Sequence, residues 1–142
     1  MISDTMKKFE FLLGRWKLKY RIPKSTFSNG GTDTGTGLFR KALNDRYIFF
    51  EYSTKSGSEA NGIFAWDEKV NAYRYWWFEN SGNFSTATCD FIDDETLAMN
   101  WHHSLLVQTF VKKDKDRIIL RMKYPNAKGG YKLVLEVVFT RK

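Results

Sequence analysis

Short stretches in which apolar and polar residues alternate recur along most of the chain, and this period of two constrains the fold more than any other feature. Polar turn sequences separate the stretches, for example at residues 44–45, 80–82 and 128–130. The pattern predicts ten β-strands. They cover about residues 15–23, 35–43, 46–55, 60–67, 71–79, 83–91, 95–102, 105–113, 117–124 and 131–141.

Most of the turns are too short to hold a helical crossover, so neighbouring strands must form antiparallel hairpins. An open sheet of ten strands exposes two strand edges, whereas a closed barrel exposes none. We therefore predict an all-β fold, an up-and-down antiparallel β-barrel of about ten strands. Residues 1–142 contain no linker, repeat or low-complexity segment, so we expect one domain.

A short helix is predicted before the first strand. Ser3 or Asp4 is a suitable N-terminal cap, and the helix then runs to about Leu13. Phe9 and the leucines that follow it share one face, and Gly14 stands where a helix C-terminal glycine belongs.

The formal net charge of +7 raises the question of a nucleic-acid partner. However, Lys17, Lys19 and Arg21 alternate with apolar Leu18 and Tyr20, as expected for the solvated outer face of a strand. The densest basic cluster, at residues 112–117, also contains two aspartates. We predict no nucleic-acid partner.

The N-terminal residues lack a signal-peptide apolar run, and nowhere are there 18 consecutive apolar residues. Cys89 is the only cysteine, so no intrachain disulfide forms, and we interpret it as a small buried hydrophobe. These features predict a cytoplasmic protein with no membrane partner. A homodimer is compatible with the sequence.

Three strands show which side chains face inward. In the third, Phe50 and Tyr52 share a face; in the ninth, Leu120 and Met122 do; in the tenth, alternate residues from Tyr131 to Phe139 do. The inward faces of the second, fourth and fifth strands stay open. Adding bulky residues from the fifth and seventh strands completes a predicted ligand-binding set. Its members are Phe50, Tyr52, Trp77, Trp101, His103, Leu120, Met122, Tyr124, Leu133 and Leu135.

The sequence Gly14-Arg15-Trp16, on the first strand and just after a short helix, resembles the Gly-x-Trp signature of the calycin superfamily. The resemblance implies that Trp16 closes the base of a barrel. It also implies that an arginine near the end of the last strand, here Arg141, packs across the indole and bonds the backbone of the helix.

Further motifs resemble an uncharacterised bacterial family of lipocalin-like domains, which implies one lipocalin-like β-barrel domain over residues 1–142. They are the Phe-Leu-x-Gly-x-Trp start at residues 11–16, a glycine before an aromatic-Asp turn at 62–67, and an aromatic run before Glu-Asn-Ser-Gly at 76–82. The chain departs from two related branches. Fatty-acid-binding proteins have a helical lid where residues 23–34 predict a loop, and an Arg-x-Tyr motif that is missing here. Nitrobindin-like haem barrels use a late proximal histidine, and none follows His103.

Chemistry-bearing motifs are scarce. His102 and His103 are adjacent, so on a strand they face opposite sides and cannot share a metal. His103 has the parity of apolar Trp101, so we predict that it faces inward. The acidic stretch at residues 90–95 lacks calcium-loop spacing and predicts a solvated turn. No nucleophile, phosphate-loop, dinucleotide or zinc pattern occurs, and we predict neither a catalytic residue nor a metal site.

The sequence therefore favours a barrel that binds a small, largely apolar ligand in its interior, with the ligand unknown. Two alternatives stay open. One is a haem-binding enzyme or sensor that uses His103, although haem is not the favoured cofactor. The other is a protein-interaction module with a solid core, which uses exposed aromatic residues of the fifth strand.

Overall fold

A computed structural model describes residues 4–25 and 29–142 of the chain. A short 3₁₀ helix, η1 (Asp4–Leu12), precedes ten strands. The strands are β1 (Gly14–Ile22), β2 (Gly31–Ala42), β3 (Tyr47–Thr54), β4 (Glu59–Asp67), β5 (Ala72–Glu79), β6 (Phe84–Asp93), β7 (Thr96–Trp101), β8 (Val107–Asp114), β9 (Arg117–Pro125) and β10 (Tyr131–Arg141). Among the described residues, no helix has the length and apolar character that a membrane crossing requires.

The strands form one closed antiparallel barrel in which each strand pairs with its sequence neighbours and β1 pairs with β10. This confirms the predicted fold class. The largest boundary difference is at β2, which begins at Gly31 rather than near residue 35. The polar residues 31–34, expected to lie in a loop, pair with residues 19–22 of β1 and lengthen that hairpin.

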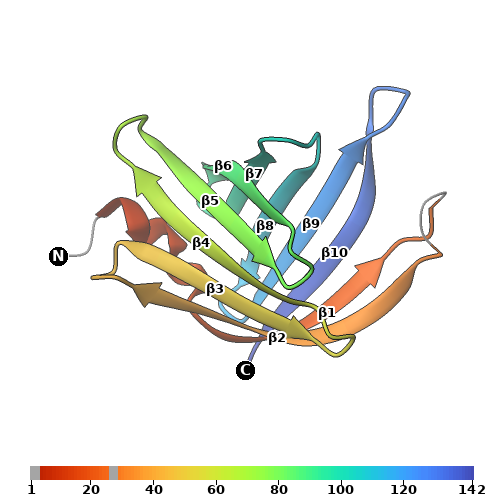
Figure 1. The fold of residues 1–142 in the computed structure, drawn as a ribbon, viewed down its shortest axis with the longest axis horizontal. Coiled ribbons are helices and arrows are strands. Elements are labelled where there is room, and N and C mark those ends of the chain that lie inside the picture. The colour runs from red at the N-terminus through yellow and green to blue at the C-terminus, as the bar shows by residue number, and fades with distance from the viewer. Residues whose placement is uncertain (1–3, 26–28) are drawn as a thin grey trace.

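Helix η1 lies against one end of the barrel, and the β1–β2 and β9–β10 hairpins extend from the other end (Figure 1). We call these the helix end and the hairpin end. Met6, Phe9 and Leu12 of the helix are buried. The ring centroid of Phe9 lies 4.9 Å from that of Phe64 and 5.1 Å from that of Phe91. The helix therefore seals its end with apolar side chains. The predicted cap Ser3 lies outside the described residues.

Trp16 and Arg141 join the two ends of the chain at the helix end. Trp16 is fully buried, and its Nε1 donates a 2.7 Å hydrogen bond to the carbonyl of Leu12. The Arg141 guanidinium carbon lies 4.1 Å from the centre of the indole. One of its terminal nitrogens donates to the carbonyl of Leu13 at 2.6 Å, and the other to that of Phe11 at 3.3 Å. The predicted arrangement of these two residues is confirmed.

Gly14 makes this contact sterically accessible. Its φ of +116° is a backbone conformation that residues with a side chain rarely adopt. A β-carbon at this position would lie 2.7 Å from a terminal nitrogen of Arg141. Glycine thus allows the chain to turn from the helix into β1 while the guanidinium packs close to the backbone.

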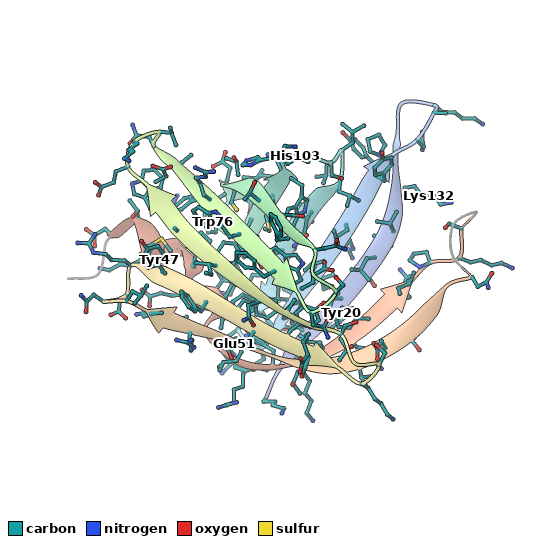
Figure 2. The ribbon with its side chains drawn as sticks, in the orientation of Figure 1. Tyr20, Tyr47, Glu51, Trp76, His103 and Lys132 are labelled. Carbon is teal, nitrogen blue, oxygen red and sulfur yellow. The ribbon has the colours of Figure 1, made fainter. Side chains whose placement is uncertain are left out.

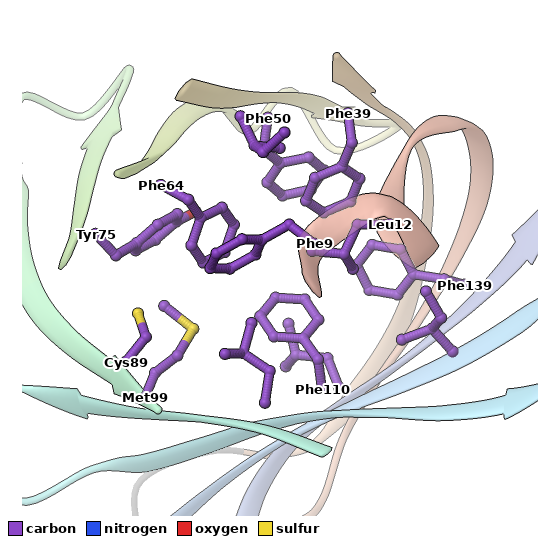
Figure 3. Packing of buried hydrophobic residues seen from close by; sticks show 14 of the residues in the cluster. Phe9, Leu12, Phe39, Phe50, Phe64, Tyr75, Cys89, Met99, Phe110 and Phe139 are labelled. Carbon is purple, nitrogen blue, oxygen red and sulfur yellow. The ribbon is translucent and has the colours of Figure 1, made fainter. Parts of the chain in front are cut away.

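Alternate residues of the strands point into the barrel and form the core, where Phe9, Phe64, Phe110 and other rings pack together (Figure 3). Phe50 of β3 faces inward as predicted, and Ile48 shares its face; Leu97 and Met99 of β7 are also buried. The faces left open by the sequence are now assigned: the inward residues are Gly35, Gly37 and Phe39 of β2, Ala60, Gly62 and Phe64 of β4, and Tyr73, Tyr75 and Trp77 of β5. Cys89 is buried in this core, as expected.

Candidate ligand cavity

The barrel interior is not filled throughout. A cavity of about 190 Å³ lies toward the hairpin end. It is enclosed mainly by aromatic and aliphatic side chains. They are Tyr20, Phe50, Tyr52, Tyr75, Trp77, Glu79, Trp101, Gln108, Phe110, Leu120, Met122, Leu135, Val137 and Phe139. An apolar cavity of about 150 Å³ is large enough for benzene, so this one has room for a ligand built on one small ring.

Seven of the ten predicted site residues line this cavity: Phe50, Tyr52, Trp77, Trp101, Leu120, Met122 and Leu135. The structure therefore brings together side chains from β3, β5, β7, β9 and β10. Their role in binding a ligand stays a prediction. The other three, His103, Tyr124 and Leu133, do not line it.

The expected inward position of His103 is wrong. Strand β7 ends at Trp101, and both histidines lie in the turn that follows, where their side chains are exposed. His103 lies at the edge of the molecule (Figure 2). His102 contacts the hydroxyls of Thr86 and Thr88, each at 2.7 Å from a ring nitrogen. None of the described residues in the cavity wall is a histidine, so the wall does not fit a haem held through His103.

The prediction for Leu133 is also wrong, and a β-bulge is the reason. Leu133 pairs with Lys123, but Leu135 pairs with Met122, so β10 carries one extra residue between them. The extra residue reverses the alternation, so Leu133 shares a face with Lys123 rather than with the cavity. Tyr124 is 45% exposed because it lies beyond the rim of the barrel.

Several lining residues were not among the predicted ones, notably Tyr20, Tyr75 and Gln108. Tyr20 follows the buried Trp16 and Leu18 at a period of two, which is a usable signal. Gln108 is 6% exposed and alternates with the buried Phe110, so it is a polar side chain in an inward position. Tyr75 lies on the strand whose large residues occupy both faces, where alternation alone gives no answer.

Two hydrogen-bonded pairs place polar atoms around the cavity. At the rim, Nε1 of Trp77 donates to the Glu79 carboxylate at 2.9 Å. Deeper in the wall, Nε1 of Trp101 donates to the amide oxygen of Gln108 at 3.3 Å. The amide nitrogen of Gln108 contacts the sulfur of Met99 at 3.5 Å. Thioether sulfur is a weak acceptor, so this amide is poorly satisfied by the protein.

Three tyrosines contribute hydroxyls to the same cavity. Burial raises the pKa of Tyr75 well above its ordinary value, and the neighbouring Cys89 and tyrosines add to the effect. The pKa of Tyr20 is raised by burial, then by Tyr52 and Asp33. The pKa of Tyr52 is raised by burial and by the carboxylates of Glu79 and Asp33. All three phenols are therefore protonated at neutral pH.

A larger hollow of about 610 Å³ lies on the outside of β2–β5. Most of the side chains along it, such as Glu51, Glu59 and Asn80, face solvent and are polar. Ligand sites are usually concave and mostly apolar. The smaller interior cavity is thus the better candidate.

Aromatic residues also lie on the outer face. In register across β3, β4 and β5 are Phe49, Ile63 and Trp76. Arg74 partly covers this stripe, since its guanidinium carbon lies 5.2 Å from the centre of Trp76. Nearer the hairpin end, Phe78 is 46% exposed and Phe84 is 73% exposed.

Comparison with known proteins supports the fold but no family. No family model matches the chain, and no curated protein matches its sequence. Two of the solved structures with a similar fold serve as examples. The crystal structure of Rv2717c from M. tuberculosis matches with a TM-score of 0.68 and 10% identity, covering 100% of this chain and 99% of that one. A de novo designed fluorescence-activating β-barrel matches with a TM-score of 0.50 and 15% identity, covering 94% of this chain and 95% of the designed one.

Proposed function

We propose that this protein binds a small, largely apolar ligand in the cavity near the hairpin end of the barrel. The observation that carries the proposal is that the two ends of the barrel interior are filled differently. Aromatic rings fill the helix end, whereas a cavity of about 190 Å³ stays open toward the hairpin end. Side chains in protein interiors normally pack with few voids larger than a water molecule. A cavity lined by aromatic rings with a few polar tips is typical of a ligand site.

We further propose that the barrel is of the lipocalin-like kind. The packing of Arg141 on Trp16, with its hydrogen bonds to the carbonyls of Leu13 and Phe11, supports this assignment. It is the arrangement that the Gly-x-Trp resemblance implied. In such a barrel the mouth is the natural place for a small ligand.

A thermal-shift screen of small apolar and aromatic compounds tests the binding proposal. A ligand at a hundredfold excess over its Kd stabilises the folded state by about 2.7 kcal/mol, so hits raise the melting temperature. Met122→Trp fills the cavity and is expected to abolish these shifts. Ile119→Trp is the matched control, because Ile119 lies on the outward face of the same strand.

Two results contradict the proposal: no compound stabilises the wild-type protein, or the hits act equally on Met122→Trp. Either result favours the interaction-module alternative. Its strongest surface in the described chain is the exposed pair Phe78 and Phe84, whose ring centroids are 6.4 Å apart.

A further inference from the structure

The polar atoms of the cavity are unequally provided with partners. Within the described residues, no hydrogen bond is formed by the hydroxyls of Tyr20, Tyr52 or Tyr75. No described side-chain nitrogen or oxygen that is sealed from solvent lacks a partner. The three hydroxyls are therefore not sealed in the wall, and all three tyrosines line the cavity. Hydroxyls in such positions need partners, which the cavity contents can supply.

The Tyr75 hydroxyl is the most firmly placed of the three. Tyr75 is 2% exposed, and its hydroxyl lies directly over Gly62 on the neighbouring strand. A β-carbon on Gly62 would overlap this oxygen, so only glycine leaves it room. The ring of Tyr75 is also held between Phe64, at 4.3 Å between centroids, and Trp101, at 5.8 Å. The hydroxyl therefore has little freedom to turn away from the cavity.

Several hydrogen-bond donors in this space lack a strong acceptor. Each of the three phenols brings one O–H donor, and its oxygen can also accept. The Gln108 amide brings two N–H donors, and the contact that the structure gives its nitrogen is to the weak acceptor sulfur of Met99. Its oxygen already accepts from Trp101. A ligand that pairs with these donors carries an acceptor such as an oxygen.

The charges around the cavity restrict that oxygen further. No lysine or arginine is among the described residues that line it, whereas the carboxylate of Glu79 is. Asp33 lies close to Tyr20 and contributes to its raised pKa. A buried anion without a cationic partner is costly, and two carboxylates near the mouth add repulsion. An anionic ligand is therefore disfavoured.

We propose that the cavity selects a neutral ring compound that carries a carbonyl oxygen, and that this oxygen accepts a hydrogen bond from the hydroxyl of Tyr75. The ring packs against Trp77, Met122 and Leu135, while Tyr20 and Tyr52 provide further donors toward the mouth. This inference rests on the proposed function, because it names the class of ligand for the same cavity.

Three probes of one size separate the contributions. Acetophenone carries the neutral carbonyl, ethylbenzene replaces that carbonyl with a methylene group, and benzoate carries an anion. Affinities are measured by calorimetry on the wild-type protein, on Tyr75→Phe and on Tyr131→Phe. Tyr131 is 59% exposed on β10 and does not line the cavity, so it is the matched loss of a phenol hydroxyl.

For the wild-type protein we expect acetophenone to bind roughly three- to tenfold more tightly than ethylbenzene, because one hydrogen bond makes about this net contribution to affinity. Benzoate is expected to bind more weakly than either. Tyr75→Phe removes the preference for acetophenone and leaves the affinity for ethylbenzene unchanged. Tyr131→Phe keeps the preference.

Other results overturn the inference in distinguishable ways. Equal affinity for acetophenone and ethylbenzene, or a preference that survives in Tyr75→Phe, refutes the carbonyl contact and leaves the apolar cavity intact. Tighter binding of benzoate refutes the argument from charge. Failure of all three probes, together with an empty thermal-shift screen, overturns the proposed function and this inference with it.

Discussion

The helix end and the hairpin end of the barrel interior use the same kinds of side chain in different ways. At the helix end, Nε1 of Trp16 donates to Leu12, and the hydroxyl of Tyr73 donates to the carbonyl of Thr5. At the hairpin end, the Tyr75 hydroxyl, two residues further along β5, has no acceptor in the described part of the chain. The tryptophan N–H groups have acceptors at both ends, whereas the tyrosine hydroxyl has an acceptor at the helix end and none among the described residues at the hairpin end.

This difference separates two roles within one fold. The packed helix end stabilises the barrel, because Nε1 of Trp16 and the hydroxyl of Tyr73 both have acceptors there. The hairpin end contributes less to the free energy of folding, because it has hydroxyls without partners in the described chain around an open cavity. Such local incompleteness is expected where a protein is built to accept a ligand.

We expect the largest difference in stability between the alanine variants of two tryptophans, one at each end of the barrel. Trp16→Ala removes a fully buried ring at the helix end and should lower the free energy of unfolding by about 3–5 kcal/mol. Trp77→Ala removes a half-buried ring from the cavity wall and should cost about 1–2 kcal/mol. Urea denaturation measures both. Equal losses would contradict the division of the interior into a packed end and an open one.

Alkaline pH should weaken the hairpin end through its phenols. The pKa of Tyr75 is raised in the folded state, so the folded protein holds this proton more tightly than the unfolded chain does. The stability is therefore fully present below pH 10, the ordinary pKa of tyrosine, and is lost as the pH rises above it.

The slope of the unfolding free energy against pH tests whether the pKa of Tyr75 is raised in the folded state. One such group removes about 1.4 kcal/mol for each pH unit above the ordinary value. Unfolding free energies measured between about pH 10 and 11 should fall less steeply in Tyr75→Phe than in the wild-type protein. An unchanged slope in Tyr75→Phe would show that its phenol ionises freely in the fold.

We expect the smallest difference in stability, at neutral pH, between variants that remove one or the other of two tyrosine hydroxyls on β5. Tyr73→Phe removes the hydrogen bond to the Thr5 carbonyl and should cost about 1 kcal/mol. Tyr75→Phe removes a hydroxyl with no partner in the described chain and should change stability by less than about 0.5 kcal/mol. Thermal unfolding of the two variants side by side gives the comparison. A greater loss for Tyr75→Phe would mean that its hydroxyl is already satisfied.

Sequence reasoning was accurate in β3, where alternation runs unbroken. Phe50 and Tyr52 kept their predicted faces because β3 contains no bulge. Alternation also runs unbroken along β9, but Tyr124 lies too near the end of that strand to reach the cavity. Sequence reasoning was wrong for Leu133, since Leu133 and Leu135 still read as alternating leucines when a bulge lies between them. It was wrong for His103 because the seventh strand ends earlier than the apolar pattern suggested.

The cavity chemistry depended on contacts that sequence spacing does not reveal. The closeness of Gly62 to the Tyr75 hydroxyl follows from the register between β4 and β5, in which Gly62 pairs with Trp77. The spacing of Gly62 and Tyr75 in the sequence does not indicate that they are in contact. The presence of many bulky inward residues was predictable, but whether they fill the barrel depends on how their volumes combine in three dimensions.

The hydrogen bonds from Arg141 to the carbonyls of Leu13 and Phe11 also affect how the barrel folds. They join residues 128 and 130 positions apart, so closure requires one of the least local contacts in the chain. Contacts between residues far apart in sequence slow folding. Eight of the nine hairpins can form from neighbouring segments before β10 arrives, but until then β1 and β9 each present an unpaired edge. The period before closure is therefore when this chain is most prone to pair with another copy of itself.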